Sequence, residues 1–183
     1  MKWAIDLDGV VANTSILMKQ VALEHGVSII FNHYKPEDST GNLLDELTSE
    51  IVHEIFTNRM NSVRPYKDAL AYIPLISELG AITFLTARRE EYNSATIDWI
   101  NSYFKISYAF ANRPSSEKAQ FVLENGFDCL IEDRLRTANE AAENGIKVYL
   151  INRHWNMRRE TNPKVIRIHS LGQFYSENYL AVA

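Results

Sequence analysis

Two aspartates one residue apart, Asp6 and Asp8, lie near the start of the chain in the stretch 4–9, which reads AIDLDG. The apolar residues that begin at Trp3 predict a buried strand that ends in a glycine turn. Because side chains two apart on a strand point the same way, we expect both carboxylates at the strand's carboxyl end. Burying two like charges is costly unless a cation or a shared proton compensates. The pair therefore indicates a metal site or acid–base chemistry, and the simpler alternative is a turn whose acids face water.

A threonine follows the next apolar run of the chain. Thr86 comes directly after the run Ala81–Leu85 and is followed by Ala87 and Arg88. A hydroxyl and the backbone N–H groups freed at a strand-to-helix turn suit an anion. The simpler alternative is that Thr86 only caps the following helix.

A lysine and a second pair of acids come later in the chain. Lys118 lies near the start of a predicted helix, Ser116–Asn125, where a cation is mildly unfavourable, so an anionic partner would explain it. Glu132 and Asp133 follow the apolar run Asp128–Ile131. Adjacent residues of a strand point to opposite faces, so only one of these two acids need coordinate a metal directly.

Short apolar runs alternate with helical patterns over the C-terminal two-thirds of the chain. This alternation is typical of βαβ units, which build a parallel sheet with right-handed crossovers. In such open α/β sheets ligands bind at the carboxyl edge of the strands. The sequence therefore predicts an α/β fold whose strand ends carry the site. The predicted strands are Ala81–Leu85, Ile106–Ala111, Asp128–Ile131, Lys147–Ile151 and Val165–Ile168, and the helices between them are Tyr92–Phe104, Ser116–Asn125 and Arg136–Asn144.

The interval from Ser15 to Pro65 lacks strand-like runs. Ser15 is expected to cap a helix that ends at Gly26, and an amphipathic helical stripe runs from Leu44 to Phe56. We therefore predict a small helical insertion between the first two strands of the sheet. The predicted division is a core of residues 1–14 and 66–183 and a helical cap of residues 15–65.

Two single residues carry structural expectations. Pro74 is expected to break the helix that leads from Tyr66 to Gly80. Cys129, the only cysteine, lies in an apolar run and is expected to be a buried, inert thiol.

The whole chain has the composition of an ordinary globular protein. Its 183 residues are 46% hydrophobic and 23% charged, which is enough for one buried core with a small accessory lobe. The net charge of −4 argues against a large non-specific nucleic-acid footprint. No stretch is long enough to span a membrane, and Asp6 and Asp8 interrupt any signal-peptide core. We therefore expect a cytoplasmic protein that binds neither a nucleic-acid polymer nor a membrane.

The candidate residues resemble, in their order, the four motifs of the haloacid dehalogenase-like hydrolase superfamily. The motifs fall on the Asp6 and Asp8 pair, on Thr86, on Lys118, and on Glu132 with Asp133. The resemblance covers residues 1 to about 156. It implies a Rossmann-like, doubly wound parallel sheet, and the helical interval 15–65 is similar to that superfamily's cap inserted after the first motif.

Four segments are similar, more narrowly, to the 5′-nucleotidase branch that includes the 5′(3′)-deoxyribonucleotidases. They are residues 6–12 (DLDGVVA), 84–88 (FLTAR), 130–134 (LIEDR) and 150–156 (LINRHWN). One position departs from that branch, because Thr14 stands about where an aromatic residue is usual. The departure weakens the expectation of base stacking at that point.

The resemblance implies a mechanism in which two acids have different roles. Asp6 would attack phosphorus to form an aspartyl-phosphate, while Asp8 would protonate the leaving oxygen and then accept a proton from water. Mg²⁺ is the implied cofactor, held by Asp6, by the backbone carbonyl of Asp8 and by Asp133. Glu132 would act through a water or by supporting another ligand.

The remaining implied contacts are with the substrate. Lys118, Thr86 and the backbone at Ala87 would hold the phosphate. Thr14 and Arg88 are candidate substrate contacts, and Arg88 would contact the phosphate or the leaving group. Other candidates for the cap's lining are Phe31, His33, Tyr34, Phe56 and Arg64.

The resulting hypothesis is a Mg²⁺-dependent phosphatase of a small phosphate monoester, with a nucleoside 5′-monophosphate as the favoured substrate. Two alternatives stay open: a phosphatase of another small metabolite such as a sugar phosphate, and a non-catalytic binding module that kept the fold. The sequence leaves the oligomeric state undetermined, and a homodimer is one option.

Overall fold

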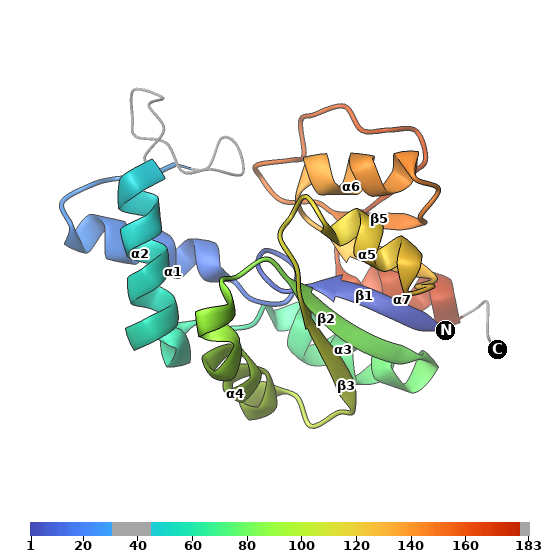
Figure 1. The fold of residues 1–183 in the computed structure, drawn as a ribbon, viewed down its shortest axis with the longest axis horizontal. Coiled ribbons are helices and arrows are strands. Elements are labelled where there is room, and N and C mark those ends of the chain that lie inside the picture. Colours follow the sequence, from blue (N-terminus) through green and yellow to red (C-terminus); the bar gives the residue numbers. More distant parts are fainter. Residues whose placement is uncertain (31–44, 180–183) are drawn as a thin grey trace.

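The computed structural model describes residues 1–30 and 45–179. These residues form a six-stranded, wholly parallel sheet with the order β3-β2-β1-β4-β5-β6, flanked by helices on both faces (Figure 1). The predicted α/β fold with a doubly wound sheet is therefore confirmed. The strands are β1 (Lys2–Asp6), β2 (Ala81–Thr86), β3 (Tyr108–Asn112), β4 (Cys129–Glu132), β5 (Val148–Ile151) and β6 (Val165–Ile168). The helices are α1 (Thr14–Glu24), α2 (Asp45–Asn58), α3 (Lys67–Leu79), α4 (Asn93–Tyr103), α5 (Lys118–Glu124), α6 (Leu135–Glu143) and α7 (Leu171–Tyr179), with short 3₁₀ turns at Met60–Ser62 and Glu90–Tyr92.

Alternate residues of the central strands pack against opposite layers of helices. Ile131 of β4 belongs to the core cluster that also holds residues of α3, α4 and α7. Leu130, its neighbour, belongs to a second cluster with residues of α5 and α6. Both faces of a parallel sheet are covered in this way, which explains why its strands are continuously apolar in sequence. Figure 1 shows α5 and α6 on one face and α3 on the other.

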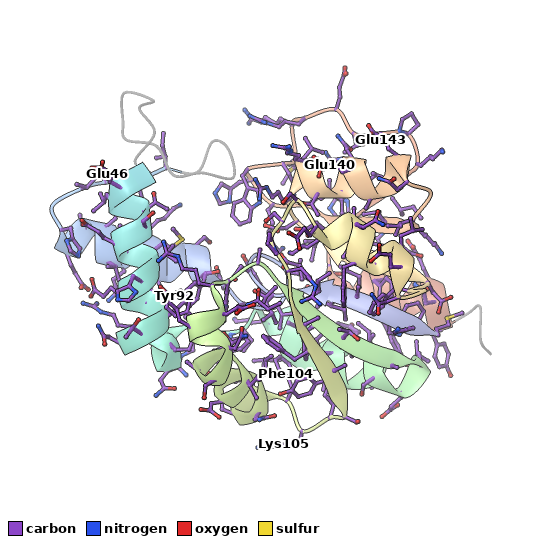
Figure 2. All side chains as sticks on the ribbon, in the orientation of Figure 1. Glu46, Tyr92, Phe104, Lys105, Glu140 and Glu143 are labelled. Atoms are coloured by element: carbon purple, nitrogen blue, oxygen red, sulfur yellow. The ribbon has the colours of Figure 1, made fainter. Side chains whose placement is uncertain are left out.

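The helices present small or apolar residues to the sheet and charged residues to solvent. On α6, Ala138, Ala141 and Ala142 are fully buried, whereas Glu143 is exposed. Figure 2 shows Glu143 on the outer side of this helix. This pattern is the amphipathic one that the sequence predicted for the helix.

The order of the strands reverses between β1 and β4. The chain builds the sheet outward from β1 through β2 to β3, and then returns to the other side of β1 for β4, β5 and β6. Crossover connections on the two sides of this point lead away from each other, which leaves a crevice at the carboxyl ends of β1 and β4. Asp6 ends β1 and Glu132 ends β4, so the predicted site lies at this crevice.

The chain leaves the sheet after β1 and returns along a neighbouring path. Asn13 N–H donates to the Arg64 carbonyl at 2.9 Å, and Tyr66 N–H donates to the Val11 carbonyl at 2.9 Å. Between these two passages α1 and α2 pack together on one side of the molecule (Figure 1). We propose, from this pairing, the division into a core of residues 1–14 and 66–183 and a cap of residues 15–65.

Two local predictions are wrong. Pro74 does not break its helix, because α3 continues through it from Lys67 to Leu79. Ile73 and Ile76 on either side of it are fully buried, and this packing offsets the backbone hydrogen bond that the proline cannot make. Ser15 does not cap α1, which begins at Thr14; its hydroxyl instead donates to the Asn13 side chain at 3.2 Å.

The prediction for the single cysteine is confirmed. Cys129 is buried in β4 as a free thiol, and burial raises its pKa to about 12. A thiol with such a pKa is not a nucleophile near neutral pH. Within residues 1–30 and 45–179, no helix has both the length and the apolar composition needed to cross a bilayer.

Candidate active site

Three neighbouring strands deliver polar residues to one edge of the sheet. Asp6 ends β1, Thr86 ends β2 and Glu132 ends β4, with Asp133 directly after it. Lys118 is the first residue of α5, where the sequence predicted a cation near a helix start. The sequence therefore placed these residues at the right ends of their elements, and parallel pairing brings those ends together.

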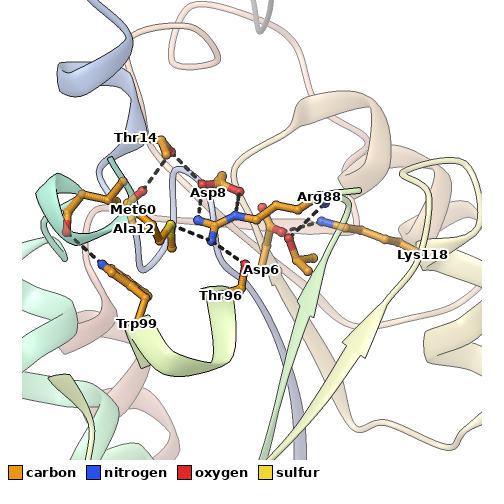
Figure 3. Close-up of polar contacts among 11 residues, drawn as sticks. Asp6, Asp8, Ala12, Thr14, Met60, Arg88, Thr96, Trp99 and Lys118 are labelled. Atoms are coloured by element: carbon orange, nitrogen blue, oxygen red, sulfur yellow. Dashed lines mark hydrogen bonds and ion pairs between the residues drawn. The ribbon is translucent and has the colours of Figure 1, made fainter. Parts of the chain in front are cut away.

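Three of these acids form a compact buried cluster. Asp6, Glu132 and Asp133 each offer an oxygen within 4.8 Å of the others, and their exposed fractions are 4%, 1% and 1%. The Lys118 ammonium lies 2.5 Å from Asp6 Oδ1 (Figure 3). It also lies 3.2 Å from Glu132 Oε2. One lysine cannot balance three buried carboxylates, so the cluster would carry excess negative charge if all three acids were ionised. A divalent cation with oxygen ligands fits this donor set.

Burial and mutual repulsion keep protons on this cluster. Burial, followed by the charge of Glu132, raises the pKa of Asp6 to about 8, although Lys118 acts in the opposite direction. Burial and the charges of Glu132 and Asp6 also raise the pKa of Asp133 well above its ordinary value. The pKa of Lys118 is raised by Asp6 and Glu132 in spite of its burial. Lys118 is therefore a fixed positive charge, while the acids need a cation to be fully ionised.

The oxygens of the second acid pair have different partners. Glu132 Oε1 accepts the backbone N–H groups of Asp133 and Arg134 at 3.2 and 3.0 Å, and Oε2 accepts from Lys118. Asp133 Oδ2 accepts the indole N–H of Trp155 at 2.9 Å. Asp133 Oδ1 is buried and has no hydrogen-bond partner among the described residues. A buried carboxylate oxygen in this state is suited to a metal ion, so Asp133 fits the role of direct ligand and Glu132 that of support.

The glycine of the DLDG stretch allows the close approach of the two loops. Gly9 has a φ of +84°, a conformation that side-chain-bearing residues rarely adopt. A Cβ atom added at this position would lie 2.0 Å from Asp133 Oδ2. Only a glycine therefore lets the turn after β1 lie against the acid after β4.

Asp8 has partners entirely different from those of Asp6. Arg88 donates to both Asp8 oxygens, from Nε to Oδ2 at 2.8 Å and from a terminal nitrogen to Oδ1 at 2.7 Å. The Thr14 hydroxyl also donates to Oδ1 at 2.8 Å (Figure 3). Burial favours a raised pKa for Asp8, but the charge and hydrogen bonds of Arg88 outweigh it, and the net pKa is lowered. Asp8 is thus held as a carboxylate, the form of an acid that accepts a proton.

Arg88 was expected to contact a phosphate or leaving group. In this structure two of its guanidinium nitrogens donate to the Asp8 carboxylate instead. Its guanidinium also donates to the Thr96 hydroxyl at 3.1 Å and lies 4.2 Å from the centre of the Phe56 ring. Arg88 and Asp8 are eighty positions apart, so no local pattern could reveal this pairing. The only signal in the sequence was the place of Arg88 two residues after β2.

The predicted phosphate-binding residues lie at different depths. Ala87 and Lys118 line a cavity of about 560 Å³, together with Asp6 and Asp8. Thr86 is fully buried, and its hydroxyl accepts the Arg88 backbone N–H at 3.2 Å. In this structure the Thr86 hydroxyl therefore supports the loop that carries Arg88. It caps neither the turn Glu90–Tyr92 nor α4, whose N-cap residues are Arg89 and Tyr92.

Residues from the proposed cap form one wall of the cavity. Phe56 of the cap and Thr14, the last residue of the core segment 1–14, both line the cavity as predicted, whereas Arg64 donates to the Tyr103 hydroxyl at 2.8 Å instead. Phe31, His33 and Tyr34 lie outside the described residues. Several other residues that line the cavity were not predicted as site residues, although Arg134 and Trp155 fall in two of the four similar segments. These residues are Ser15, Met18, Thr48, Ser49, Val52, Arg89, Ser115, Arg134 and Trp155.

No protein-family model and no curated protein matches this chain, but solved structures do. A haloacid dehalogenase-like family hydrolase from Streptococcus pneumoniae superposes with a TM-score of 0.62 at 15% identity, covering 96% of this chain and 97% of that one. The chain has the haloacid dehalogenase fold. CbbY from Rhodobacter sphaeroides, in a mutant complex with xylulose-1,5-bisphosphate, gives 0.59 at 11% identity over 94% of this chain and 95% of that one. The 2-haloacid dehalogenase from Pseudomonas syringae gives 0.53 at 14% identity over 100% and 99%. At these identities the likeness establishes the haloacid dehalogenase fold and nothing finer.

Proposed function

We propose that this chain is a Mg²⁺-dependent phosphatase that hydrolyses a small phosphate monoester through an aspartyl-phosphate on Asp6. The observation that carries the proposal is the buried cluster of Asp6, Glu132 and Asp133, in which Lys118 contacts Asp6 and Glu132. A 2-haloacid carries one carboxylate, and its halide leaving group needs no divalent cation. A phosphoryl group brings several anionic oxygens, so the cluster favours phosphoryl transfer over dehalogenation.

In the first step a bond forms between an Asp6 oxygen and phosphorus while the ester P–O bond breaks. Mg²⁺, held by Asp6, Asp133 and the backbone carbonyl of Asp8, would neutralise charge on the phosphoryl oxygens. Lys118 would neutralise charge at the same group, and backbone N–H groups near Ala87 would bind its other oxygens. The leaving oxygen must take a proton, and among the described lining residues Asp8 is the acid that lies outside the cluster.

In the second step water attacks the phosphorus of the aspartyl-phosphate, releasing inorganic phosphate and regenerating Asp6. Asp8 would accept the proton of this water. The pairing with Arg88 stabilises the carboxylate form that this step requires and opposes the protonated form that the first step requires. We infer that the arrangement in this structure is set for hydrolysis of the aspartyl-phosphate.

The experiment that tests the proposal is release of phosphate from p-nitrophenyl phosphate with and without Mg²⁺. Replacing Asp6 by Asn should reduce kcat on the order of 10³-fold or more, as removal of a nucleophile does in other covalent enzymes. Asp98→Asn, the same change at an exposed position of α4, is the matched control and should leave kcat unchanged. Full activity of Asp6→Asn would overturn the mechanism. Ligand binding without turnover in the wild-type protein would favour the non-catalytic module.

We propose a nucleoside 5′-monophosphate as the substrate, supported by the four segments similar to the 5′-nucleotidase branch. A sugar phosphate is the second candidate, because Thr14, Ser15, Thr48 and Ser49 put four hydroxyl-bearing side chains on the cavity's lining. The Phe56 ring is covered on one side by Arg88, so that face is closed to a base. Comparing kcat/KM for a panel of nucleoside monophosphates and sugar phosphates distinguishes the two, and a preference for sugars would overturn the nucleotide assignment.

A further inference from the structure

The segment that follows β5 is bound to both loops of the candidate metal site. The Arg153 Nε–H donates to the Gly9 carbonyl at 2.6 Å, in the turn after β1. The Asn156 side chain donates to the Asp133 carbonyl at 2.7 Å, and the Trp155 indole donates to the Asp133 carboxylate at 2.9 Å. The segment is one of the four similar to the nucleotidase branch, but neither the sequence nor the proposed mechanism gives it a role.

The indole hydrogen bond distinguishes the two oxygens of the Asp133 carboxylate. Oδ2 is held by Trp155 on one side and lies so close to the Gly9 backbone that a Cβ there would overlap it. Oδ1 is left without a partner among the described residues, although it is fully buried. The carboxylate thus has one fixed orientation, with the unpartnered oxygen available to a cation shared with Asp6.

We propose that Trp155 is a positioning residue that orients the Asp133 carboxylate for a divalent cation. The inference rests on the proposed metal-dependent function and deepens it. Outer partners that orient a metal ligand are worth roughly 10–100-fold in metal affinity, because without them the ligand must be ordered when the ion binds. Trp155 is 7% exposed and lies in the cavity wall, so its indole also borders the space where ion and substrate would bind.

The test is the affinity of the whole protein for Mg²⁺ and Mn²⁺, measured by titration calorimetry. Trp155→Phe keeps an aromatic ring but replaces the indole by a smaller phenyl ring that has no N–H donor. The Kd for either ion is expected to rise about 10-fold or more in this variant. Trp99→Phe is the matched control, because its buried indole also donates one hydrogen bond, to the Val63 carbonyl at 2.8 Å, away from the acid cluster. Its Kd should equal that of the wild type.

The Mg²⁺ dependence of activity gives a second measurement, which would not change if Trp155 had only a structural role. Raising Mg²⁺ should restore kcat of Trp155→Phe to within a few-fold of wild type, while the Mg²⁺ concentration for half-maximal rate stays raised. Equal ion affinity in Trp155→Phe and Trp99→Phe would overturn the inference and leave the proposed function standing. Absence of Mg²⁺ or Mn²⁺ binding by the wild-type protein would overturn the proposed function itself, and the inference with it.

A third measurement keeps the inference testable if Trp155→Phe fails to fold. In the double variant Trp3→Phe/Trp99→Phe, Trp155 is the only tryptophan of the chain. Its emission is expected to change when Mg²⁺ is added, because the ion alters the charge on the carboxylate that accepts its N–H. Emission that does not respond to saturating Mg²⁺ would overturn the role.

Discussion

Asp6 and Asp8 are only one residue apart, but their carboxylates have different partners and opposite pKa shifts. Asp6 shares a single lysine with Glu132 inside a cluster of three buried acids, and its pKa is raised to about 8. Asp8 has the two-pronged contact of Arg88 to itself, with a further donor in Thr14, and its pKa is lowered. The same residue type therefore has opposite pKa shifts because Asp6 is more deeply buried and shares its cation with another acid, whereas Asp8 has a cation of its own. Pairs of like groups with divergent pKa values are the usual basis for dividing acid, base and nucleophile roles.

Among the changes that test this comparison, Asp8→Asn should have the largest effect on activity. It removes the proton carrier but leaves the acid cluster intact. The kcat is expected to fall about 10²–10⁴-fold, the range that general acid–base catalysis supplies. The loss should be greater for an alkyl phosphate than for p-nitrophenyl phosphate, whose leaving group needs less protonation. Steady-state kinetics on both substrates measures this difference, and equal losses would contradict the acid role. Ion affinity should be kept, because the side chain lies outside the cluster.

The next effect concerns Arg88, whose removal would make the environment of Asp8 resemble that of an unpaired acid. Breaking a buried ion pair by removing one partner costs about 3–5 kcal/mol, and because Asp8 is 23% exposed to the cavity we expect about 2 kcal/mol. Chemical denaturation of Arg88→Ala should therefore show a lower free energy of unfolding. The pKa of Asp8, followed by ¹³C NMR of its carboxyl group, should rise. Arg89→Ala, at the exposed neighbouring position, is the control and should change neither quantity. An unchanged pKa would mean that Arg88 does not set the charge of Asp8.

The smallest expected effect, counted per pH unit, is a pH dependence of the stability of the metal-free protein. It comes from the titration of Asp6. Unfolded Asp6 loses its proton near the ordinary value of 3.8 and folded Asp6 near 8, so the folded state holds the extra proton between these values. Stability therefore falls as the pH rises through this window, by at most about 1.4 kcal/mol per pH unit for one proton. The lowered pKa of Asp8 acts only below its ordinary value of 3.8 and does not oppose this trend.

Thermal unfolding in EDTA between pH 5 and 8 measures this dependence. The Tm is expected to fall as the pH rises, and the slope should flatten in Asp6→Asn, which cannot titrate. Saturating Mg²⁺ should raise the Tm most at high pH, since the ion replaces the proton. A metal-free Tm that rises steadily over this range would contradict the raised pKa of Asp6.

The elements of the core could be predicted from the sequence because their signals are local. Continuous apolar runs marked strands that are covered on both faces, and glycines such as Gly126 and Gly145 marked helix ends, where both have a positive φ. The expected helix break at Pro74 was wrong for a reason that lies outside the local sequence. Packing of Ile73 and Ile76 against the core holds α3 continuous across the proline.

The candidate site was predictable in its members but not in its pairings. Each of Asp6, Thr86, Lys118 and Glu132 ends or begins an element, so the parallel sheet was bound to gather them at one edge. Which cation serves which acid depends on side-chain positions within a few ångströms. Arg88 was assigned to the substrate and is paired with Asp8, and Trp155 was not assigned at all.

The βαβ order, the acids at the strand ends and the glycine turn of the DLDG stretch could all be inferred from the sequence alone. These follow from backbone periodicity and from the conformational limits of single residues, which are properties of short stretches. The pairings of these residues follow from the folded structure: Lys118 bonds both Asp6 and Glu132, and Arg88 bonds Asp8. The hydrogen bond from Trp155 to one oxygen of Asp133 is likewise seen only there. Those contacts join residues 14 to 112 positions apart, and their energies depend on distance and burial, which no local pattern encodes.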